Sequence, residues 1–349
     1  MARYLGGLLT ADESQVLPSD NYENTSGNAV FTSDEQYLLN ISNRWPTPGN
    51  AAPRGVFAGG YGGSGISNVM DYINIASTGN AVDFGDLLGS AGYQLAAAAS
   101  TTRGVFFGGQ DSSDTSTNVI QYITIASTGN GSDFGDLTVA RHQGAACSST
   151  TRGCFGGGFA SSFGARFNVI DYVTIASEGN ATDFGDLVSA GRYISATSST
   201  TRGVWGGGDN SSGTVVNTMQ YVTIASTGNT TDFGDLLSTQ YQMANGVCSS
   251  GTRGLFLGGN SSPTNVIQYI TIASTGNATD FGDLLSTSYQ NEATSSSTRG
   301  IEGAGFQGGL SNVIQYVTIA SLGNATDFGD LTVSRYAGSA CSNAQGGLS

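Results

Sequence analysis

The chain repeats itself six times, and this repetition constrains its fold more than any other feature of the sequence. The segment NVIQYITIASTGNATDFGDL at 265–284 has close counterparts elsewhere in the chain. An Arg-Gly pair and an apolar run precede each copy, and a short run of small residues follows it. The arginines of these pairs, spaced 46 to 51 residues apart, are Arg54, Arg103, Arg152, Arg202, Arg253 and Arg299.

Each period holds four strand-sized runs of apolar or β-branched residues, bounded by Gly, Asn or Ser clusters. In the run 266–273 both alternating faces are largely apolar, which is typical of a sheet covered on both sides. Repeats of this length with four strands are typical of the blades of a β-propeller. The sequence therefore predicts an all-β fold, a six-bladed β-propeller with four-stranded antiparallel blades.

The small-residue runs predict how such a ring closes. The first Arg-Gly strand has no small-residue strand before it, whereas an extra one, YAGSACSN at 336–343, follows the last copy. We expect this C-terminal strand to close blade 1 through backbone hydrogen bonds between residues near Ser339 and residues near Phe57, which removes free sheet edges. The predicted domains are a short N-terminal segment at 1–50 and the propeller at 51–349.

The order of these motifs resembles the kelch family of β-propellers over residues 54–343. That family has a second strand that ends in Gly-Gly, a third strand with a Tyr and an outer strand with an aromatic residue. The Gly pairs here are Gly59-Gly60, Gly108-Gly109, Gly157-Gly158, Gly207-Gly208 and Gly258-Gly259, and the last copy departs with Ala304-Gly305. The outer aromatic residue is Phe in place of the usual Trp, at Phe84, Phe134, Phe184, Phe233, Phe281 and Phe328.

The Asp-Phe-Gly motif in every copy suggests a kinase at first sight. A phosphoryl-transfer enzyme needs a single such motif and a partner lysine, whereas this chain has six and no lysine. A turn and anchor is the simpler interpretation, since Asp280 and Asp283 bracket Gly282 behind the turn residues STGN. We expect the repeated arginines to pair with these aspartates, and six calcium sites completed by backbone carbonyls are the alternative.

The charge of the chain limits its partners. The formal net charge is −14, and all 12 basic residues are arginine. Phosphate backbones and anionic lipid surfaces repel such a chain, so we expect neither nucleic acid nor membrane insertion, although a local Arg cluster could hold one anionic sugar group. The N-terminal apolar runs are too short for a signal peptide or a membrane span, which predicts a soluble protein made in a cytoplasm.

The cysteines show no disulfide framework or metal-binding spacing. Cys248 and Cys341 lie singly in separate copies, whereas Cys147 and Cys154 flank one turn and are expected to face each other across a hairpin. Two buried thiols and a cross-strand disulfide are both compatible with that spacing.

Nothing in the sequence indicates an enzyme, a cofactor or a resident metal. A kelch-like copper oxidase needs at least two His ligands, and His142 is the only histidine. A glycosidase-type pair of carboxylates remains open, although most carboxylates lie in the repeated motifs. We therefore expect no catalytic residues.

The copies differ only in segments that such a topology places on one face. The turns STTRG and STGNATD barely vary, whereas the segments between the second and third strands and the links between blades vary in length and chemistry. Tyr, Arg, Asn and Gln on a rigid scaffold suit recognition, with a glycan as the expected ligand, although simple drift of loops is the alternative. The candidate ligand-binding residues are Tyr61, Tyr93, Asp111, Asp114, Arg141, His142, Phe159, Phe163, Arg166, Phe167, Arg192, Tyr193, Asp209, Asn210, Tyr241, Gln242, Tyr289, Gln290, Arg335 and Tyr336.

The first fifty residues lie outside the repeats. Ser33 and Gln36 form a capping box that predicts a short helix at about 34–42. The segment resembles the N-terminal region of structural proteins of tailed, particularly marine, bacteriophages. The residues that carry this resemblance, and the expected virion-attachment residues, are Phe31, Glu35, Gln36, Trp45 and Pro46.

That resemblance implies a phage virion protein exposed on the particle. We expect a non-enzymatic tail fibre or similar appendage, a homo-oligomer on the particle for which a trimer is one candidate, whose N-terminal segment binds other tail or capsid proteins and whose variable face recognises a host receptor. The alternatives are a capsid decoration or adaptor protein and, third, a glycan-cleaving tailspike.

Overall fold

A computed structural model describes residues 3–5, 8–10, 52–89 and 92–348. The chain divides into two compact units, Met1–Ala52 and Pro53–Ser349. In the first unit, β1 (Arg3–Leu5) pairs with β2 (Leu8–Thr10) in an antiparallel sheet. The predicted helix at 34–42 and the expected attachment residues lie outside the described residues.

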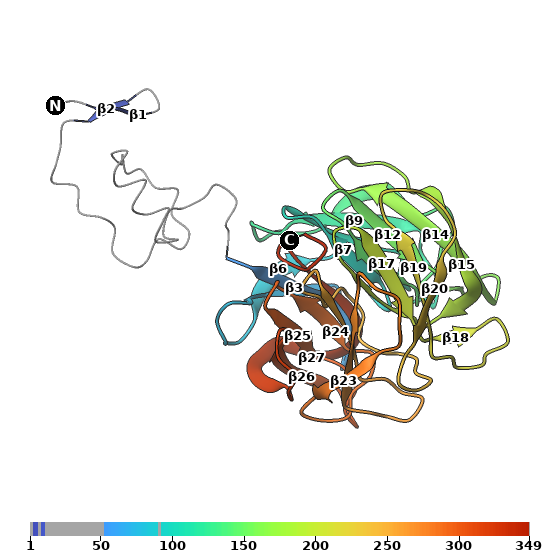
Figure 1. The fold of residues 1–349 in the computed structure, drawn as a ribbon. Helices are drawn as coiled ribbons and strands as arrows, with labels where there is room; N and C mark the ends of the chain where they lie inside the picture. Colours follow the sequence, from blue (N-terminus) through green and yellow to red (C-terminus); the bar gives the residue numbers. More distant parts are fainter. Residues whose placement is uncertain (1–2, 6–7, 11–51, 90–91, 349) are drawn as a thin grey trace. The chain divides into compact units, whose positions relative to one another are not determined.

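The second unit is all-β, and its named strands pair antiparallel (Figure 1). Among the residues that the structure describes there is no α-helix, and hence none long and apolar enough to span a membrane. Each repeat, numbered 1 to 6 by its Arg-Gly pair, supplies strands in the predicted order. The first strands are β7 (Ala96–Ala99), β11 (Ala145–Ser148), β16 (Ser195–Ser198) and β24 (Glu292–Ser295). The second strands are β3 (Arg54–Gly62), β8 (Arg103–Phe107), β12 (Arg152–Gly156), β17 (Arg202–Gly206), β21 (Arg253–Leu257) and β25 (Arg299–Gly303).

The remaining strands complete these sheets. The third strands are β5 (Val69–Asn74), β9 (Val119–Thr124), β14 (Ala165–Thr174), β19 (Thr218–Thr223), β22 (Val266–Thr271) and β26 (Ser311–Thr318). The fourth strands are β6 (Val82–Asp86), β10 (Ser132–Asp136), β15 (Thr182–Arg192), β20 (Thr231–Asp235) and β23 (Thr279–Asp283). Three two-residue strands, β4 (Gly65–Ile66), β13 (Phe159–Ala160) and β18 (Asp209–Asn210), lie in the variable segments.

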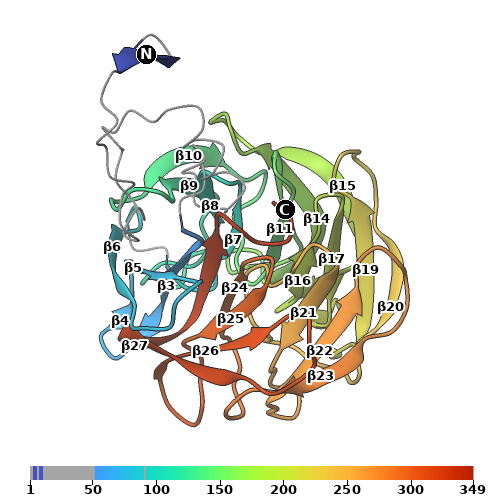
Figure 2. The ribbon, with the colours of Figure 1, turned by 60° about the vertical axis from the view of Figure 1, so that its left-hand side comes forward.

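The C-terminal strand joins the last repeat to the first, as the sequence predicts. β27 (Thr326–Ser342) is the fourth strand of repeat 6 in its first half and pairs with β3 in its second half, with Ser339 opposite Ala58 and Ala340 opposite Phe57. The tail then runs in among the first strands, where Gln345 Nε2 donates to Ser148 Oγ of β11 at 2.6 Å (Figure 2).

Repeat 5 departs from the prediction of four regular strands, since its sheet contains only β21, β22 and β23. Arg253 follows Gln242 by eleven positions, whereas Arg103 follows the matching Gln94 by nine. The two additional residues, Asn245 and Gly246, form isolated bridges to Glu292 and Ala340 instead of a continuous ladder with β21. A two-residue insertion therefore displaces the expected first strand.

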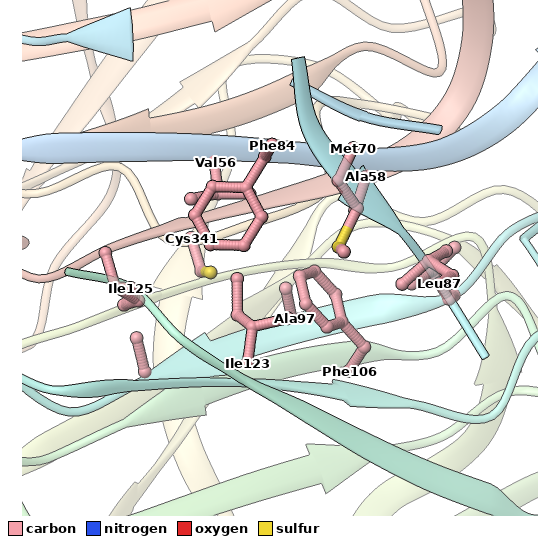
Figure 3. Packing of buried hydrophobic residues seen from close by; sticks show 12 residues of the cluster. Val56, Ala58, Met70, Phe84, Leu87, Ala97, Phe106, Ile123, Ile125 and Cys341 are labelled. Atoms are coloured by element: carbon pink, nitrogen blue, oxygen red, sulfur yellow. The ribbon is translucent and has the colours of Figure 1, made fainter. Parts of the chain in front are cut away.

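Apolar faces of neighbouring sheets pack directly on one another. One cluster joins Val56, Met70 and Phe84 of repeat 1 to Phe106 and Ile123 of repeat 2, and Figure 3 shows the two sets facing each other. Buried clusters of the same composition occur between the other repeats. This two-sided burial accounts for the apolar residues on both faces of the third strands.

The repeated arginines do not pair with the repeated aspartates, so that expectation is wrong. Each guanidinium lies 4.3 to 4.8 Å from the centre of the Tyr ring on the adjacent third strand, as Arg253 does over Tyr269. Its Nη1 donates at 2.9 to 3.3 Å to an Ile carbonyl of the following repeat, and Arg299 of repeat 6 donates to Ile75 of repeat 1. Stacking on a ring and bonding a fixed carbonyl suit the planar guanidinium, and tie each repeat to the next.

The Asp-Phe-Gly-Asp segment also joins neighbouring repeats, which explains why it occurs in every copy. The Phe ring is buried, and its carbonyl accepts a backbone hydrogen bond of 2.7 to 2.9 Å from the glycine of the STGN, SEGN or SLGN turn of the following repeat, as Phe281 does from Gly323. Gly282 has a φ of +145°, and an added Cβ would lie 2.4 Å from the Gly323 carbonyl oxygen, so only glycine fits this contact. The motif is therefore a structural anchor.

All four cysteines are buried free thiols. Cys147 and Cys154 lie directly opposite each other on β11 and β12, as the spacing predicts, but they are not bonded. Burial raises the pKa of the Cys147 thiol well above its ordinary value, which keeps it protonated and unreactive.

Buried charges gather where β27 meets repeat 1. Arg335 Nη1 donates to Asp71 Oδ2 at 2.7 Å, and Arg335 Nε donates to Glu292 Oε1 at 3.0 Å. Glu302 lies nearby, where the other repeats have Phe or Trp, and accepts hydrogen bonds from Gln315 and Ser288. Burial raises the pKa of Glu292 to about 7 and that of Glu302 to about 8.

These raised pKa values predict a stability that falls as pH rises. Between a pH of about 4.5 and about 8 the folded protein holds a proton on Glu302 that the unfolded chain has lost, so the free energy of unfolding decreases by up to about 1.4 kcal/mol per pH unit. Glu302→Gln removes this contribution. We expect the variant to show a shallower pH dependence and a higher stability than the parent at pH 8.

Urea unfolding between pH 5 and pH 9 measures the two slopes. Glu178→Gln, which changes a half-exposed carboxylate, is the matched control and should leave the slope unchanged. Equal slopes for the parent and Glu302→Gln would show that Glu302 is ionised in the folded protein.

Candidate functional site

Because of the strand pairing, all the variable segments lie at one edge of the sheets. In repeat 2, for example, Phe107 pairs with both Ala96 and Ile120, so the connections that leave these ends share an edge. We call this the variable edge. The opposite ends, at Arg103 and Thr124, carry the nearly invariant turns and form the constant edge.

A closed circuit of six backbone hydrogen bonds gathers the variable links around one point. The circuit residues, each donating its N–H to the carbonyl of the one named before it at 2.7 to 3.1 Å, are Ala337, Gln94, Gln143, Tyr193, Gln242 and Gln290, and Ala337 donates to Gln290. All six have φ between +52° and +64°, in the left-handed region that residues other than Gly rarely adopt. The circuit holds this conformation, because each residue both donates and accepts within it.

Five aromatic side chains form a continuous cluster beside the circuit. Tyr61, Tyr93 and Tyr336 lie with their ring centres 5.8 to 6.0 Å apart, and Phe306 links Tyr336 to Tyr289. Tyr61 is 42 % exposed. Burial, with Tyr336 beside it, raises the pKa of Tyr93 above its ordinary value, so this phenol stays a neutral hydrogen-bond donor.

Three charged side chains form a second group, where repeats 3 and 4 meet. Arg166 Nε and Nη2 each donate to a carboxylate oxygen of Asp209 at 2.9 Å, and Arg192 Nε donates to Asp209 Oδ2 at 3.2 Å. Arg192 also lies 4.9 Å from the ring centres of Phe159 and Tyr193. Two guanidinium groups that share one carboxylate leave a local excess of positive charge on an acidic protein.

His142 packs beneath this group. Its ring lies 5.7 Å from that of Phe159, and its Nδ1 is 2.9 Å from Ser116 Oγ. Burial, with the charge of Arg192 added, lowers the pKa of His142 to about 4. His142 is therefore neutral at physiological pH and fixes the position of Phe159.

Five predicted site residues are buried, and two of them have no exposed surface at all. Arg141 and Arg335 have no exposed surface, and their guanidinium groups bind Asp171 and Asp71 at 3.0 and 2.7 Å. These arginines have no surface to offer a ligand directly. Each of these ion pairs attaches the link between two repeats to the third strand of the following repeat.

Other predicted residues shape loops. Asp111 and Asn210 accept backbone hydrogen bonds of 2.8 to 3.0 Å from residues two and four positions later, which closes two similar turns. Asp114 adopts a φ of +59° in the first of them. Phe163 is 70 % exposed at the tip of the longest segment, and Phe167 is half-buried beside it. Tyr241 contacts Tyr193 with ring centres 5.9 Å apart.

Sequence reasoning missed several residues that the structure brings to this edge. Gln94 and Gln143 belong to the same circuit as the predicted Gln242 and Gln290, and their equal spacing in the repeats was the available signal. Phe306 joins the aromatic cluster although the segment that follows it, QGGLS, looks featureless. Within the part of the chain that the structure describes, no group of three or more His, Cys, Asp or Glu side chains is placed to hold a metal ion.

Comparison of the sequence with models of known protein families gives no match, and comparison with curated proteins finds no similar protein. Conclusions about function therefore depend on the geometry of the variable edge and on the resemblances that the sequence carries.

Proposed function

We propose that residues 53–349 form a six-bladed, kelch-like β-propeller. Three kinds of contact support this interpretation, because each runs from every repeat to the next and from repeat 6 back to repeat 1. They are the arginine-to-carbonyl bonds, the bonds from the STGN turns to the Phe carbonyls, and the circuit at the variable edge. A closed ring is the simplest arrangement that satisfies all three.

The proposed function is recognition of a saccharide on a host cell surface, by a virion appendage of a tailed bacteriophage. The observation that carries the recognition proposal is the gathering of the variable links around one backbone circuit, flanked by the aromatic cluster and the charged group. Aromatic and Arg side chains on a rigid frame are the typical composition of binding surfaces. The phage assignment depends on the resemblance of the N-terminal residues.

Binding of the purified full chain to susceptible bacterial cells tests this proposal. We expect labelled protein to bind the cells and to block adsorption of the phage. Phe163→Ala and Tyr61→Ala, at exposed positions of the variable edge, should each weaken binding about tenfold, an effect typical of an aromatic contact residue.

Leu322→Ala is the matched control. Leu322 is 57 % exposed at the constant edge, so its truncation removes comparable apolar surface without touching the variable edge. Binding to capsids but not to cells would instead identify a decoration or adaptor protein, and turnover of the polysaccharide would identify a tailspike enzyme.

A further inference from the structure

The backbone circuit surrounds a small cavity at the variable edge. Its volume is about 30 Å³, enough for one or two water-sized groups, and all six circuit residues line it. The other lining residues are Asn245 and the small or apolar residues Gly144, Ile194, Met243 and Gly338. No charged side chain lines the cavity, so the group that it suits is uncharged.

Asn245 lines this cavity, and its side chain has an unsatisfied acceptor. It belongs to the two-residue insertion of repeat 5, and its Nδ2 donates to the Leu95 carbonyl at 2.6 Å. That bond fixes the amide orientation, because the reversed amide would place Oδ1 against the carbonyl oxygen. Oδ1 is buried and has no hydrogen-bond partner. A buried acceptor of this kind favours a ligand that carries a donor.

The amides around the cavity are held in place. Gln143 Nε2 donates to Gln94 Oε1 at 2.6 Å and to the Tyr193 hydroxyl at 3.0 Å, and Gln242 Oε1 accepts from Asn260 Nδ2 at 2.8 Å. Preorganised groups of this kind lose little freedom when a ligand binds. Amides and phenols donate and accept as hydroxyl groups do, so the lining matches the chemistry of a sugar.

Aromatic rings stand at the border of the cavity. Tyr193 lines it and contacts Tyr241, and the link on the opposite side of the circuit carries Tyr336 next to Ala337. The cavity is too small for a whole sugar ring, but it admits one hydroxyl or hydroxymethyl group while the C–H face of the ring lies against a phenol.

We propose that this cavity binds a hydroxyl-bearing end of a neutral saccharide, with one hydroxyl donating to Asn245 Oδ1. The inference rests on the proposed function and specifies its ligand: an uncharged sugar terminus that enters along the axis of the circuit. The charged group of Arg166, Arg192 and Asp209 lies outside the cavity lining, and it meets the lining where Arg192 Nη1 donates to Gln143 Oε1 at 3.4 Å.

Methyl glycosides of glucose, galactose and mannose are the probes. We expect saturation-transfer NMR of the full chain to detect binding of at least one of them, with a millimolar Kd. Gln242→Asn shortens an amide while keeping a residue that tolerates the left-handed conformation, and Asn245→Ala removes the acceptor. Each should weaken binding at least threefold, and Thr223→Ala at the constant edge should not change it.

Thermal unfolding of each variant distinguishes a lost contact from a lost fold, and Gln242→Asn serves if Asn245→Ala does not fold. Absence of binding by all three glycosides would overturn the proposal, as would unchanged affinity in both variants. Binding of glucuronic acid alone, reduced by Arg192→Ala, would overturn it in favour of the charged group. Cell binding without glycoside binding would reject this inference only, whereas glycoside binding without cell binding would reject the proposed function.

Discussion

Deletion of Arg335–Ser349 is expected to abolish the cooperative unfolding of the protein. The deletion removes every pair between β27 and β3, from Arg335 opposite Gly62 to Ser342 opposite Gly55, and exposes the buried side chains of repeats 1 and 6. Because the net stability of a protein is only about 5 to 15 kcal/mol, the loss of a whole central strand exceeds it. Circular dichroism melting and size-exclusion chromatography measure the result.

A chain that ends at Asn343 is the control. It keeps the pairing with β3 and loses only the tail contacts, such as the bond from Gln345 to Ser148, so it should unfold cooperatively at a moderately lower Tm. Addition of a synthetic peptide of residues 334–349 to the deleted chain should restore folding. A deleted chain that melts like the parent would show that β27 does not hold the first sheet.

Arg335→Ala is expected to destabilise the protein by about 3 to 5 kcal/mol, because it leaves two buried carboxyl groups, Asp71 and Glu292, without their cation. The penalty should depend on pH. Below the pKa of Glu292, about 7 in the parent, this group is protonated in both proteins and adds nothing to the difference. Above it the parent ionises Glu292 against Arg335 while the variant must keep the proton, so the difference grows with pH.

The chain provides its own matched comparison. Arg141 makes the equivalent contact with a single carboxylate, Asp171, in repeat 3, so Arg141→Ala should show a smaller penalty that lacks the step near pH 7. The double variant with Glu292→Gln should also lose that step. Urea unfolding from pH 5 to pH 9 resolves these curves, and identical curves for the two arginine variants would contradict the proposed role of Glu292.

The sequence predicted the strands well because they repeat. Because each apolar run occurs six times, a strand that is ambiguous in one copy can be identified from the others. The additional small-residue strand at 336–343 correctly indicated the pairing of Ala340 with Phe57. The prediction of repeated Arg to Asp pairs failed for a physical reason. An exposed carboxylate competes poorly with a fixed Ile carbonyl and a Tyr ring for a planar guanidinium, and spacing within one repeat contains no information on which residue of the next repeat lies nearby.

The candidate site was less predictable, since it depends on contacts between repeats. The burial of Arg141 and Arg335 had a readable signal: third strands carry Asp71 and Asp171 in the two repeats that have an Arg two positions before the circuit residue, and Gln in the others. The left-handed conformation of the circuit residues had no comparable signal, because Gln rarely adopts that conformation unless the neighbouring repeat holds it there. The orphan acceptor of Asn245 depends on a carbonyl from a distant repeat.

β27 pairs with strands of both repeat 6 and repeat 1, and this determines when the sheet of repeat 1 is completed during translation. A ribosome delivers β3 with the first repeat and its partner, the second half of β27, only after the sixth, so one side of β3 stays unpaired while repeats 2 to 6 are made. The sheets of repeats 2 and 4 use only their own strands, and that of repeat 3 adds only the short β18 of repeat 4, so these sheets can form as they leave the exit tunnel. The first sheet is thus complete only after β27 has been made, and a chain that stalls before β27 would present the bare edge of β3 to other chains.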